Sequence, residues 1–188
     1  MLVGHVQEIT RHPVKSFTGE QVQKTKVMGY GLYGDRSHAF KDKNGKFLTI
    51  TQVPEMVRYQ AVFSGEEALD HYPEIQVKTP SGNVLTWGDT AFQEEMDQLL
   101  KQEASFVEYS PAHIPWFGKR LQIGDHVELE IKRHCERCMI ITVDPTDSKR
   151  DTSLLKTVVK ERKNHFGVYA SVIRTGEISL GDQVFLKD

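Results

Sequence analysis

The sequence has 188 residues, of which 38% are hydrophobic and 27% are charged, as in an ordinary globular protein. Lys and Arg number 24 against 26 Asp and Glu, so the formal net charge of −2 argues against a broad basic face for nucleic acid or an anionic membrane. No apolar run approaches the roughly 20 residues of a membrane-spanning helix, and the first residues lack the apolar stretch of a signal peptide. We therefore expect one domain over residues 1–188, located in the cytoplasm, with no nucleic-acid or membrane partner.

Short alternating segments separated by glycine-containing turns indicate a mainly β fold. Two amphipathic helices interrupt this pattern, at 90–102 and 152–164, and the first begins with a capping box of Thr90 and Gln93. The predicted strands lie at 2–10, 20–28, 36–42, 47–50, 57–63, 74–79 and 84–87.

Two segments near the end of the chain, 121–129 and 178–186, share an apolar-Gly-Asp-x-Val pattern. Gly-Asp between alternating apolar residues is a turn signal that starts a strand. Two such units in a β-rich chain predict a closed or nearly closed β-barrel with a few short helices.

The two cysteines, Cys135 and Cys138, form one CxxC motif between predicted strands at 127–131 and 139–143. A strand after the motif argues against a thioredoxin-like site, in which the CxxC opens a helix. Haem attachment requires a histidine directly after the second cysteine, where this sequence has Met139. A structural zinc site usually takes two spaced pairs of ligands, and no second CxxC or HxxxH is found.

Two interpretations of the thiols stay open. Free cysteines are often simply small buried residues. Alternatively, the cationic neighbours Arg133, His134 and Arg137 favour a reactive thiolate, which is a soft ligand suited to redox-active metals.

Two loops contain residues that suit an anion. Lys15 and Ser16 offer a cation and a hydroxyl after the first strand, a combination that suits phosphate. Three glycines within 29–34 precede Asp35 and Arg36, whose guanidinium could bind an oxyanion through two hydrogen bonds. Taken singly, the Lys-Ser pair is very weak evidence for a site, and the second pattern is more typical of a turn capped by Asp35 with Arg36 in a surface or structural ion pair.

Taken together, several segments resemble the MOSC family, named after the C-terminal domain of molybdenum-cofactor sulfurase. Their order and spacing through almost the whole chain make the resemblance specific. It implies a single MOSC domain over residues 1–188, a small stand-alone member of bacterial type with a barrel fold. The matching segments are PVKS at 13–16, GLYGDR at 31–36, FLTITQVPEM at 47–56, RCMIITVDPTD at 137–147, HFGVYASV at 165–172 and GEISLGDQVFL at 176–186.

In MOSC members that hold molybdenum cofactor (molybdopterin), the resemblance implies that one group of residues contacts the phosphate and rim of the pterin. This group consists of Lys15, Ser16 and Arg36, with Thr49 and Gln52 as further contacts.

The resemblance also assigns the second cysteine of the CxxC motif. Cys138 follows Arg137, as in the family's Arg-Cys pattern, and is implied as the molybdenum ligand or the sulfur-carrying, catalytic residue. Arg137 is implied as a further cation for the cofactor. Cys135 is then a neighbouring thiol without an assigned role.

One region departs from the family pattern. Cofactor-binding members commonly carry an Arg-Pro-Asn segment before the Gly-Asp turn, and residues 103–125 contain none. Either one anchor of the cofactor is absent, or His113, Lys119 or Arg120 supplies it.

Three functions follow from the resemblance. The first is reduction of N-hydroxylated small molecules with molybdenum bound to Cys138, for which a separate redox partner protein must supply electrons, because the chain has no ferredoxin-like cysteine cluster. The second is a sulfur carrier, in which Cys138 accepts a persulfide from a pyridoxal-phosphate-dependent cysteine desulfurase for the assembly of a metal–sulfur centre. The third is a non-catalytic accessory barrel.

Overall fold

The computed structural model describes residues 1–108 and 119–187, and within them the fold is mainly β with two α-helices. The strands are β1 (Leu2–His5), β2 (Thr10–Arg11), β3 (Glu20–Gln21), β4 (Lys24–Met28), β5 (Gly31–Leu32), β6 (His38–Lys41), β7 (Phe47–Leu48), β8 (Gln60–Phe63), β9 (Ile75–Lys78), β10 (Val84–Thr86), β11 (Ser105–Glu108), β12 (Lys119–Ile123), β13 (Val127–Glu136), β14 (His165–Arg174), β15 (Gly176–Ser179) and β16 (Gln183–Lys187). The helices are α1 (Thr90–Leu100), α2 (Thr152–Arg162) and the short 3-10 helices η1 (Pro54–Arg58) and η2 (Met139–Thr142).

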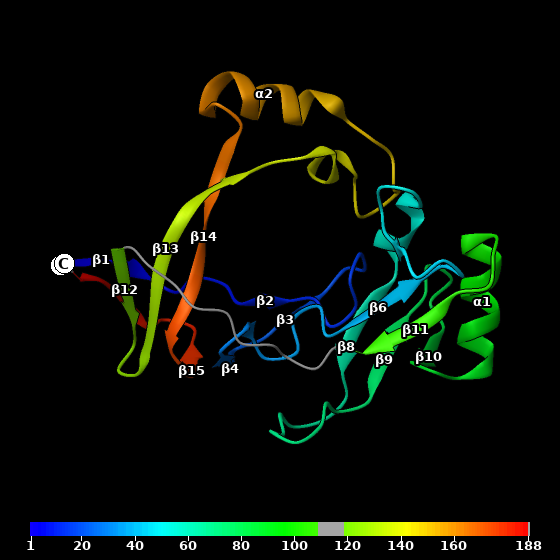
Figure 1. Ribbon diagram of the computed structural model, residues 1–188, viewed down its shortest axis with the longest axis horizontal. Helices are drawn as coiled ribbons and strands as arrows, with labels where there is room; N and C mark the ends of the chain where they lie inside the picture. Colours follow the sequence, from blue (N-terminus) through cyan, green and yellow to red (C-terminus); the bar gives the residue numbers. More distant parts are fainter. Residues whose placement is uncertain (109–118, 188) are drawn as a thin grey trace.

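Five antiparallel strands form the largest sheet, in the order β1-β16-β12-β13-β14. The two apolar-Gly-Asp-x-Val segments contribute its centre, because β12 and β16 pair directly, with Leu121 opposite Leu186 and Ile123 opposite Val184. Figure 1 shows β13 and β14 extending from this sheet towards α2.

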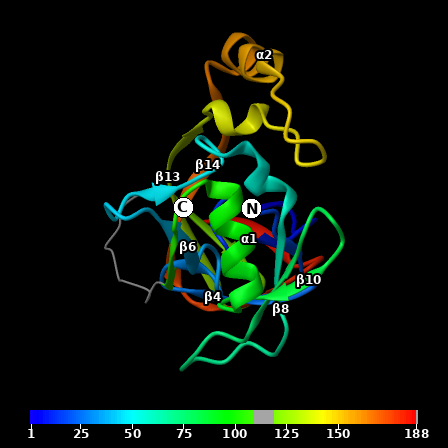
Figure 2. The same cartoon turned by 90° about the vertical axis from the view of Figure 1, so that its right-hand side faces the viewer.

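The other half of the molecule consists of two small sheets and α1. The sheets have the orders β10-β9-β8 and β11-β6-β7, and Figure 2 shows α1 in front of them. Phe92, Met96 and Leu100 of α1 are buried in the larger hydrophobic core, together with Phe40 and Val77 from the sheets. This core therefore fixes the strands and loops on which the candidate site lies.

A third group of strands lies between these two halves in Figure 1. It contains the pair β2-β3 and the sheet β15-β4-β5. Isolated parallel bridges, Val14 with His38 and Thr18 with Gln60, join the loop after β2 to the larger core. A second, smaller core contains Ile9, Val27, Val127 and Ile178.

The prediction of a barrel is confirmed only as a mainly β fold with a few helices. Within the described residues the strands form five open sheets, and none of these sheets closes on itself. A barrel requires a continuous ladder of staggered strands. Here β2, β3 and β5 have two residues each, and three register shifts interrupt the pairing of β13 with β14, so the ladder is broken at several places.

The prediction of a strand at 139–143 is wrong, because η2 occupies this segment. The backbone N of Ile141 donates to Cys138 O at 3.2 Å, and Thr142 Oγ1 donates to Met139 O at 2.7 Å. These hydrogen bonds pair backbone and hydroxyl groups of the segment with each other. Ile and Val favour a strand mainly where they pack against a paired neighbouring strand. A four-residue 3-10 helix also lacks the α-helix N-terminus that a thioredoxin-like CxxC uses.

Both predicted α-helices are confirmed, with differences at their ends and faces. The capping box at Thr90 is wrong, because Asp89 is the N-cap of α1 and the Gln93 amide donates instead to Ala104 O at 3.0 Å. No residue of α2 is buried, so its apolar face remains partly exposed. No helix within 1–108 and 119–187 is long and apolar enough to cross a membrane.

Candidate functional site

A cavity of 620 Å³, which we call the central cavity, lies between three segments of the chain. These are the loop at 12–18, the segment at 49–57 and the segment at 140–145 that contains η2. Among the residues that the MOSC resemblance implies for cofactor binding, the cavity brings together Lys15, Ser16, Arg36 and Thr49.

Backbone hydrogen bonds join the two loops predicted to bind an anion. Arg36 N donates to His12 O at 2.6 Å, and His12 N donates to Asp35 Oδ1 at 2.8 Å. Lys15 N donates to His38 O at 2.8 Å. Lys15 and Arg36 therefore belong to one hydrogen-bonded unit, although they come from separate loops.

Ser16 and Arg36 have backbone conformations that non-glycine residues rarely adopt, with φ of 75° and 55°. This left-handed region costs roughly 1–2 kcal/mol per residue. Positive φ also occurs at the C-caps Lys101 and Lys163, at Asn164 directly after the second C-cap, and at Ser148 in the turn that follows Asp144. Ser16 and Arg36 differ from these residues because they line the cavity, and backbone strain is found at binding sites, where the surrounding structure holds side chains ready for a ligand.

Gly34 fixes the turn that presents Arg36. Its φ is 68°, and a Cβ at this position would lie 2.3 Å from the ring of Phe63. Phe63 belongs to the larger core, so the ring cannot move away freely. A side chain at residue 34 would therefore displace the turn and Arg36 with it.

Lys15 and Arg36 are the charged side chains of the central cavity. The Arg36 side chain is 57% exposed and forms an ion pair with Asp35. The Nζ of Lys15 lies 4.4 Å from the centroid of the Phe47 ring, a cation–π contact that restrains the side chain and leaves its charge. Within the part of the chain that the structure describes, no carboxylate pairs with Lys15.

Thr49 and Gln52 have different positions, although both were implied as cofactor contacts. Gln52 Oε1 accepts hydrogen bonds from Thr49 N at 3.1 Å and from Thr49 Oγ1 at 2.5 Å. The other end of the Gln52 amide donates to Phe47 O at 3.4 Å. Gln52 therefore stabilises the turn and lies outside the lining of the cavity, whereas Thr49 is part of it.

The segment around η2 forms the third wall and is attached to the second. Arg150 Nη2 donates to Thr51 O at 3.1 Å, and a β-bridge joins Arg150 to Val143. Val143 and Ile140 line the cavity and give this wall an apolar surface.

Cys138 is exposed and directly precedes η2. It lies two residues before Ile140, which lines the central cavity, but Cys138 itself is not part of the lining. Its thiol is therefore accessible from outside, next to the third wall.

Cys135 is buried in an environment that favours its thiolate. A hydrogen bond from Tyr169 lowers the pKa of Cys135, and Arg137, whose Nη1 donates to the sulfur at 3.2 Å, lowers it further. The same hydrogen bond raises the pKa of Tyr169. Arg137 therefore contacts Cys135 and is not part of the cavity lining.

No local sequence pattern marks Tyr169 as a neighbour of the thiol. It reaches Cys135 through the pairing of β13 with β14, in which Tyr169 lies opposite Arg133. This register follows an irregularity between Ile131 and Arg133, so simple alternation along either strand does not predict it.

None of the three residues expected to stand in for the Arg-Pro-Asn segment is among the described residues that line the cavity. His113 and the side chain of Lys119 lie outside the described residues. Arg120 lies on β12, opposite Glu130 and Lys187, and does not line the cavity.

The central cavity suits a ring system that carries a phosphate. Two cations and the Ser16 hydroxyl can bind the phosphate, Thr49 Oγ1 can accept a hydrogen bond because it donates its proton to Gln52, and an apolar surface can contact the ring. The polar groups belong to Lys15, Arg36, Ser16 and Thr49, and the apolar ones to Ile50, Ile140 and Val143. Among the described residues, no three His, Cys, Asp or Glu side chains come together as metal ligands.

Two family models match the chain. The MOSC N-terminal beta barrel domain matches residues 3–122, and the MOSC domain matches residues 106–185. No curated protein matches the sequence. Among solved structures, a crystal structure of the YUAD protein from Bacillus subtilis is similar with a TM-score of 0.44 and 14% identity, over 96% of this chain and 93% of that chain.

The family models confirm the resemblance that the ordered sequence segments indicated. They overlap at residues 106–122 and together span residues 3–185. A single domain over residues 1–188 stays a prediction. The model of the MOSC N-terminal beta barrel domain covers more than half of the chain, and the model of the MOSC domain continues it to residue 185. This protein therefore belongs to the MOSC family, with a MOSC N-terminal beta barrel domain followed by a MOSC domain.

Proposed function

We propose that the protein binds molybdenum cofactor in the central cavity and reduces N-hydroxylated small molecules with electrons from a separate redox protein. One observation carries the proposal, namely that the residues lining one cavity include Lys15, Ser16, Arg36 and Thr49. The left-handed φ of Ser16 and Arg36 supports a ligand at this place. Membership of the MOSC family supports molybdenum cofactor as that ligand.

Lys15 and Arg36 would bind the phosphate of the cofactor. The planar guanidinium of Arg36 matches two phosphate oxygens, and its ion pair with Asp35 orients it. The Ser16 hydroxyl would donate to a further oxygen. Thr49 Oγ1 already donates its proton within the turn, so it would act as an acceptor for an N–H of the ring.

Cys138 would hold the metal as a thiolate, a soft ligand that suits a redox-active metal. The bound cofactor supplies the centre at which electrons are stored and passed on. Reduction of an N-hydroxyl group breaks the N–O bond, consumes two electrons and two protons, and releases water. The electrons come from another protein, since two cysteines are too few to hold an iron–sulfur cluster.

Elemental analysis and pterin fluorescence, after expression in a host that makes molybdenum cofactor, test the proposal. We expect the wild type to carry molybdenum and Lys15→Met and Arg36→Met to bind the cofactor about tenfold more weakly, as for loss of a charged hydrogen bond. Cys138→Ala should lose the metal. Lys43→Met removes an exposed cation from a turn and should retain both metal and pterin. Wild-type molybdenum content in both cavity variants would contradict binding in this cavity.

The exposure of Cys138 favours a second candidate function, a sulfur carrier for the assembly of a metal–sulfur centre. A cysteine desulfurase from a separate chain could transfer sulfur from cysteine to the Cys138 thiolate, forming the S–S bond of a persulfide and leaving alanine. Mass spectrometry after incubation with such an enzyme should detect one added sulfur in the wild type and in Cys135→Ser, and none in Cys138→Ser. A protein that takes up neither metal nor sulfur would fit the non-catalytic accessory barrel.

A further inference from the structure

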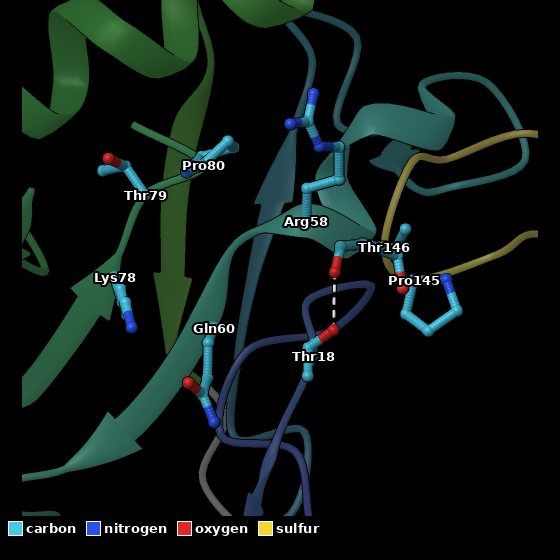
Figure 3. A pocket seen from close by; sticks show the side chains of 9 residues that line it. Thr18, Arg58, Gln60, Lys78, Thr79, Pro80, Pro145 and Thr146 are labelled. Atoms are coloured by element: carbon cyan, nitrogen blue, oxygen red, sulfur yellow. Dashed lines mark hydrogen bonds between the residues drawn. The ribbon is translucent and has the colours of Figure 1, made fainter. Parts of the chain in front are cut away.

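A second cavity, which we call the side pocket, adjoins the central cavity. It has a volume of 350 Å³ and shares the lining residues Thr18, Val57 and Pro145 with the central cavity. Figure 3 shows Lys78 on one side of the side pocket and Thr18 with Thr146 on the other. A ligand that extends past the shared residues would therefore contact both cavities.

The lining of the side pocket contains two cations and no carboxylate. The cations are Arg58 and Lys78, and neither forms an ion pair with any residue in 1–108 or 119–187. Asp147 lies outside the lining, and its pKa is lowered mainly by hydrogen bonds from Lys149 and also by the charge of Arg58. Because the chain as a whole has more acidic than basic residues, this pocket is a local enrichment of positive charge.

Backbone pairing holds the polar side chains of the side pocket in a row. Thr18 is bridged to Gln60, and Gln60 lies opposite Lys78 in the ladder of β8 and β9. Thr18 N donates to Tyr59 O at 2.8 Å, and Ala61 N donates to Thr18 O at 2.9 Å, which fixes the register. Residues that lie directly opposite each other project to the same face. Lys78 is therefore carried by a defined sheet surface rather than by a loop.

Existing hydrogen bonds decide which groups of the side pocket can donate to a ligand. Thr18 Oγ1 donates to Val57 O, and Gln60 Nε2 donates to Gly19 O at 3.1 Å. The Thr146 hydroxyl has no hydrogen-bond partner among the described residues. The donors that remain are this hydroxyl, the second N–H of the Gln60 amide and the two cations, which are groups that suit an oxyanion.

We propose that the side pocket is an oxyanion subsite for the small-molecule substrate. It binds a carboxylate or phosphate group of that molecule, while the reacting end of the molecule lies in the central cavity. The anion site itself follows from the charges and hydrogen bonds described above, and only its use by a substrate rests on the proposed function. The substrate class is accordingly an N-hydroxylated compound that carries a second, anionic group.

Inorganic phosphate is the probe for a binding test that is independent of any reaction. The test uses the Arg36→Met protein, in which phosphate binding in the central cavity is weakened, and follows the backbone amide NMR signals of Lys78 and Thr146. We expect saturable shifts of both signals, and roughly tenfold weaker binding after Lys78→Met or Arg58→Met, as for loss of a charged hydrogen bond. Lys43→Met is the matched control and should bind as before. Absence of shifts at both amides, or unchanged affinity in both variants, overturns the subsite.

Steady-state kinetics distinguishes a substrate anion from free phosphate as the occupant. Two N-hydroxylated compounds that differ only in one carboxylate are compared in wild type and Lys78→Met. We expect KM to rise about tenfold for the carboxylated compound, with kcat and the KM of the neutral compound unchanged. Equal changes for both compounds would show that the substrate does not use the side pocket. If neither compound is reduced, the proposed function fails, and the phosphate titration alone decides the subsite.

Discussion

The backbone of Ser16, which lines the central cavity, is strained. Its φ of 75° is unfavourable for any residue with a Cβ. Ser16→Gly should remove this strain and raise the free energy of unfolding by about 0.5–1 kcal/mol, after allowing for the greater freedom of glycine in the unfolded chain. The same change should lower the cofactor content, because the hydroxyl is lost. Urea denaturation of the cofactor-free protein and molybdenum analysis measure the two effects.

Ser16→Ala is the matched control, because it removes the hydroxyl and keeps the strained φ. It should lose cofactor like Ser16→Gly without the gain in stability. A glycine variant that is less stable than wild type would contradict the interpretation that this position is strained.

The lining of the central cavity could be predicted only in part, for reasons that differ between residues. Lys15, Ser16 and Arg36 belong to compact motifs, and the structure brings them to one cavity. Gln52 belongs to an equally compact motif, but both ends of its amide are occupied within the turn, which depends on side-chain hydrogen bonds that a motif does not encode. Arg137 contacts Cys135 because of the local backbone path after β13, which the residue types alone do not determine.

The two α-helices have the same length, but we expect them to contribute very different amounts to the free energy of unfolding. Phe92 in α1 is fully buried, whereas Leu154 in α2 is 51% exposed. Phe92→Ala should therefore lower the free energy of unfolding by roughly 3–5 kcal/mol, and Leu154→Ala should change it by less than about 0.5 kcal/mol. Urea denaturation of both variants checks the difference. Similar losses would mean that α2 is packed against the rest of the molecule as tightly as α1.

The hairpin, which has a local turn signal, was predictable, whereas a segment whose structure depends on a distant partner was not. The hairpin of β9 and β10 follows from its Pro-Ser-Gly-Asn turn, in which Gly82 has a φ of 91° and Thr79 N donates to Asn83 O at 2.8 Å. The segment 139–143 has strand-forming residues, but apart from the single bridge of Val143 to Arg150 it pairs with no strand of the described residues, and it forms η2.

At the level of the whole molecule, His38 couples stability to pH. It is 5% exposed and packs between the rings of Tyr72 and Trp87, and its Nδ1 lies 2.8 Å from Ser37 Oγ. Burial lowers the pKa of His38 to about 4, from about 6.5 in the unfolded chain. Between these values the unfolded chain binds the extra proton, so the free energy of unfolding should fall as the pH falls from 6.5 to 4, by about 3 kcal/mol in total.

Urea denaturation at a series of pH values measures this effect, with His38→Gln as the comparison. The variant should show a pH dependence that is weaker by the contribution of His38, whatever its stability at neutral pH. An identical slope in both proteins between pH 4 and 6.5 would rule out His38 as its source.

Whether the sheets close into a barrel could not be predicted from the sequence. Alternation and turn residues locate strands such as β9 and β12, because these signals act over a few residues. Closure depends on register over the whole set of strands, and the three shifts between β13 and β14 show how single extra residues change it.

The hydrogen bond from Arg150 to Thr51 joins residues from the two parts of the chain that the two family models match. The central cavity has walls from both parts, so neither part alone can provide the complete set of contacts. A ligand that contacts all walls of the cavity therefore binds to both parts at once. By mass action, a ligand present at 100 times its Kd would add roughly 2.7 kcal/mol to the free energy of unfolding, so loading of the site should stabilise the packing of the two parts against each other.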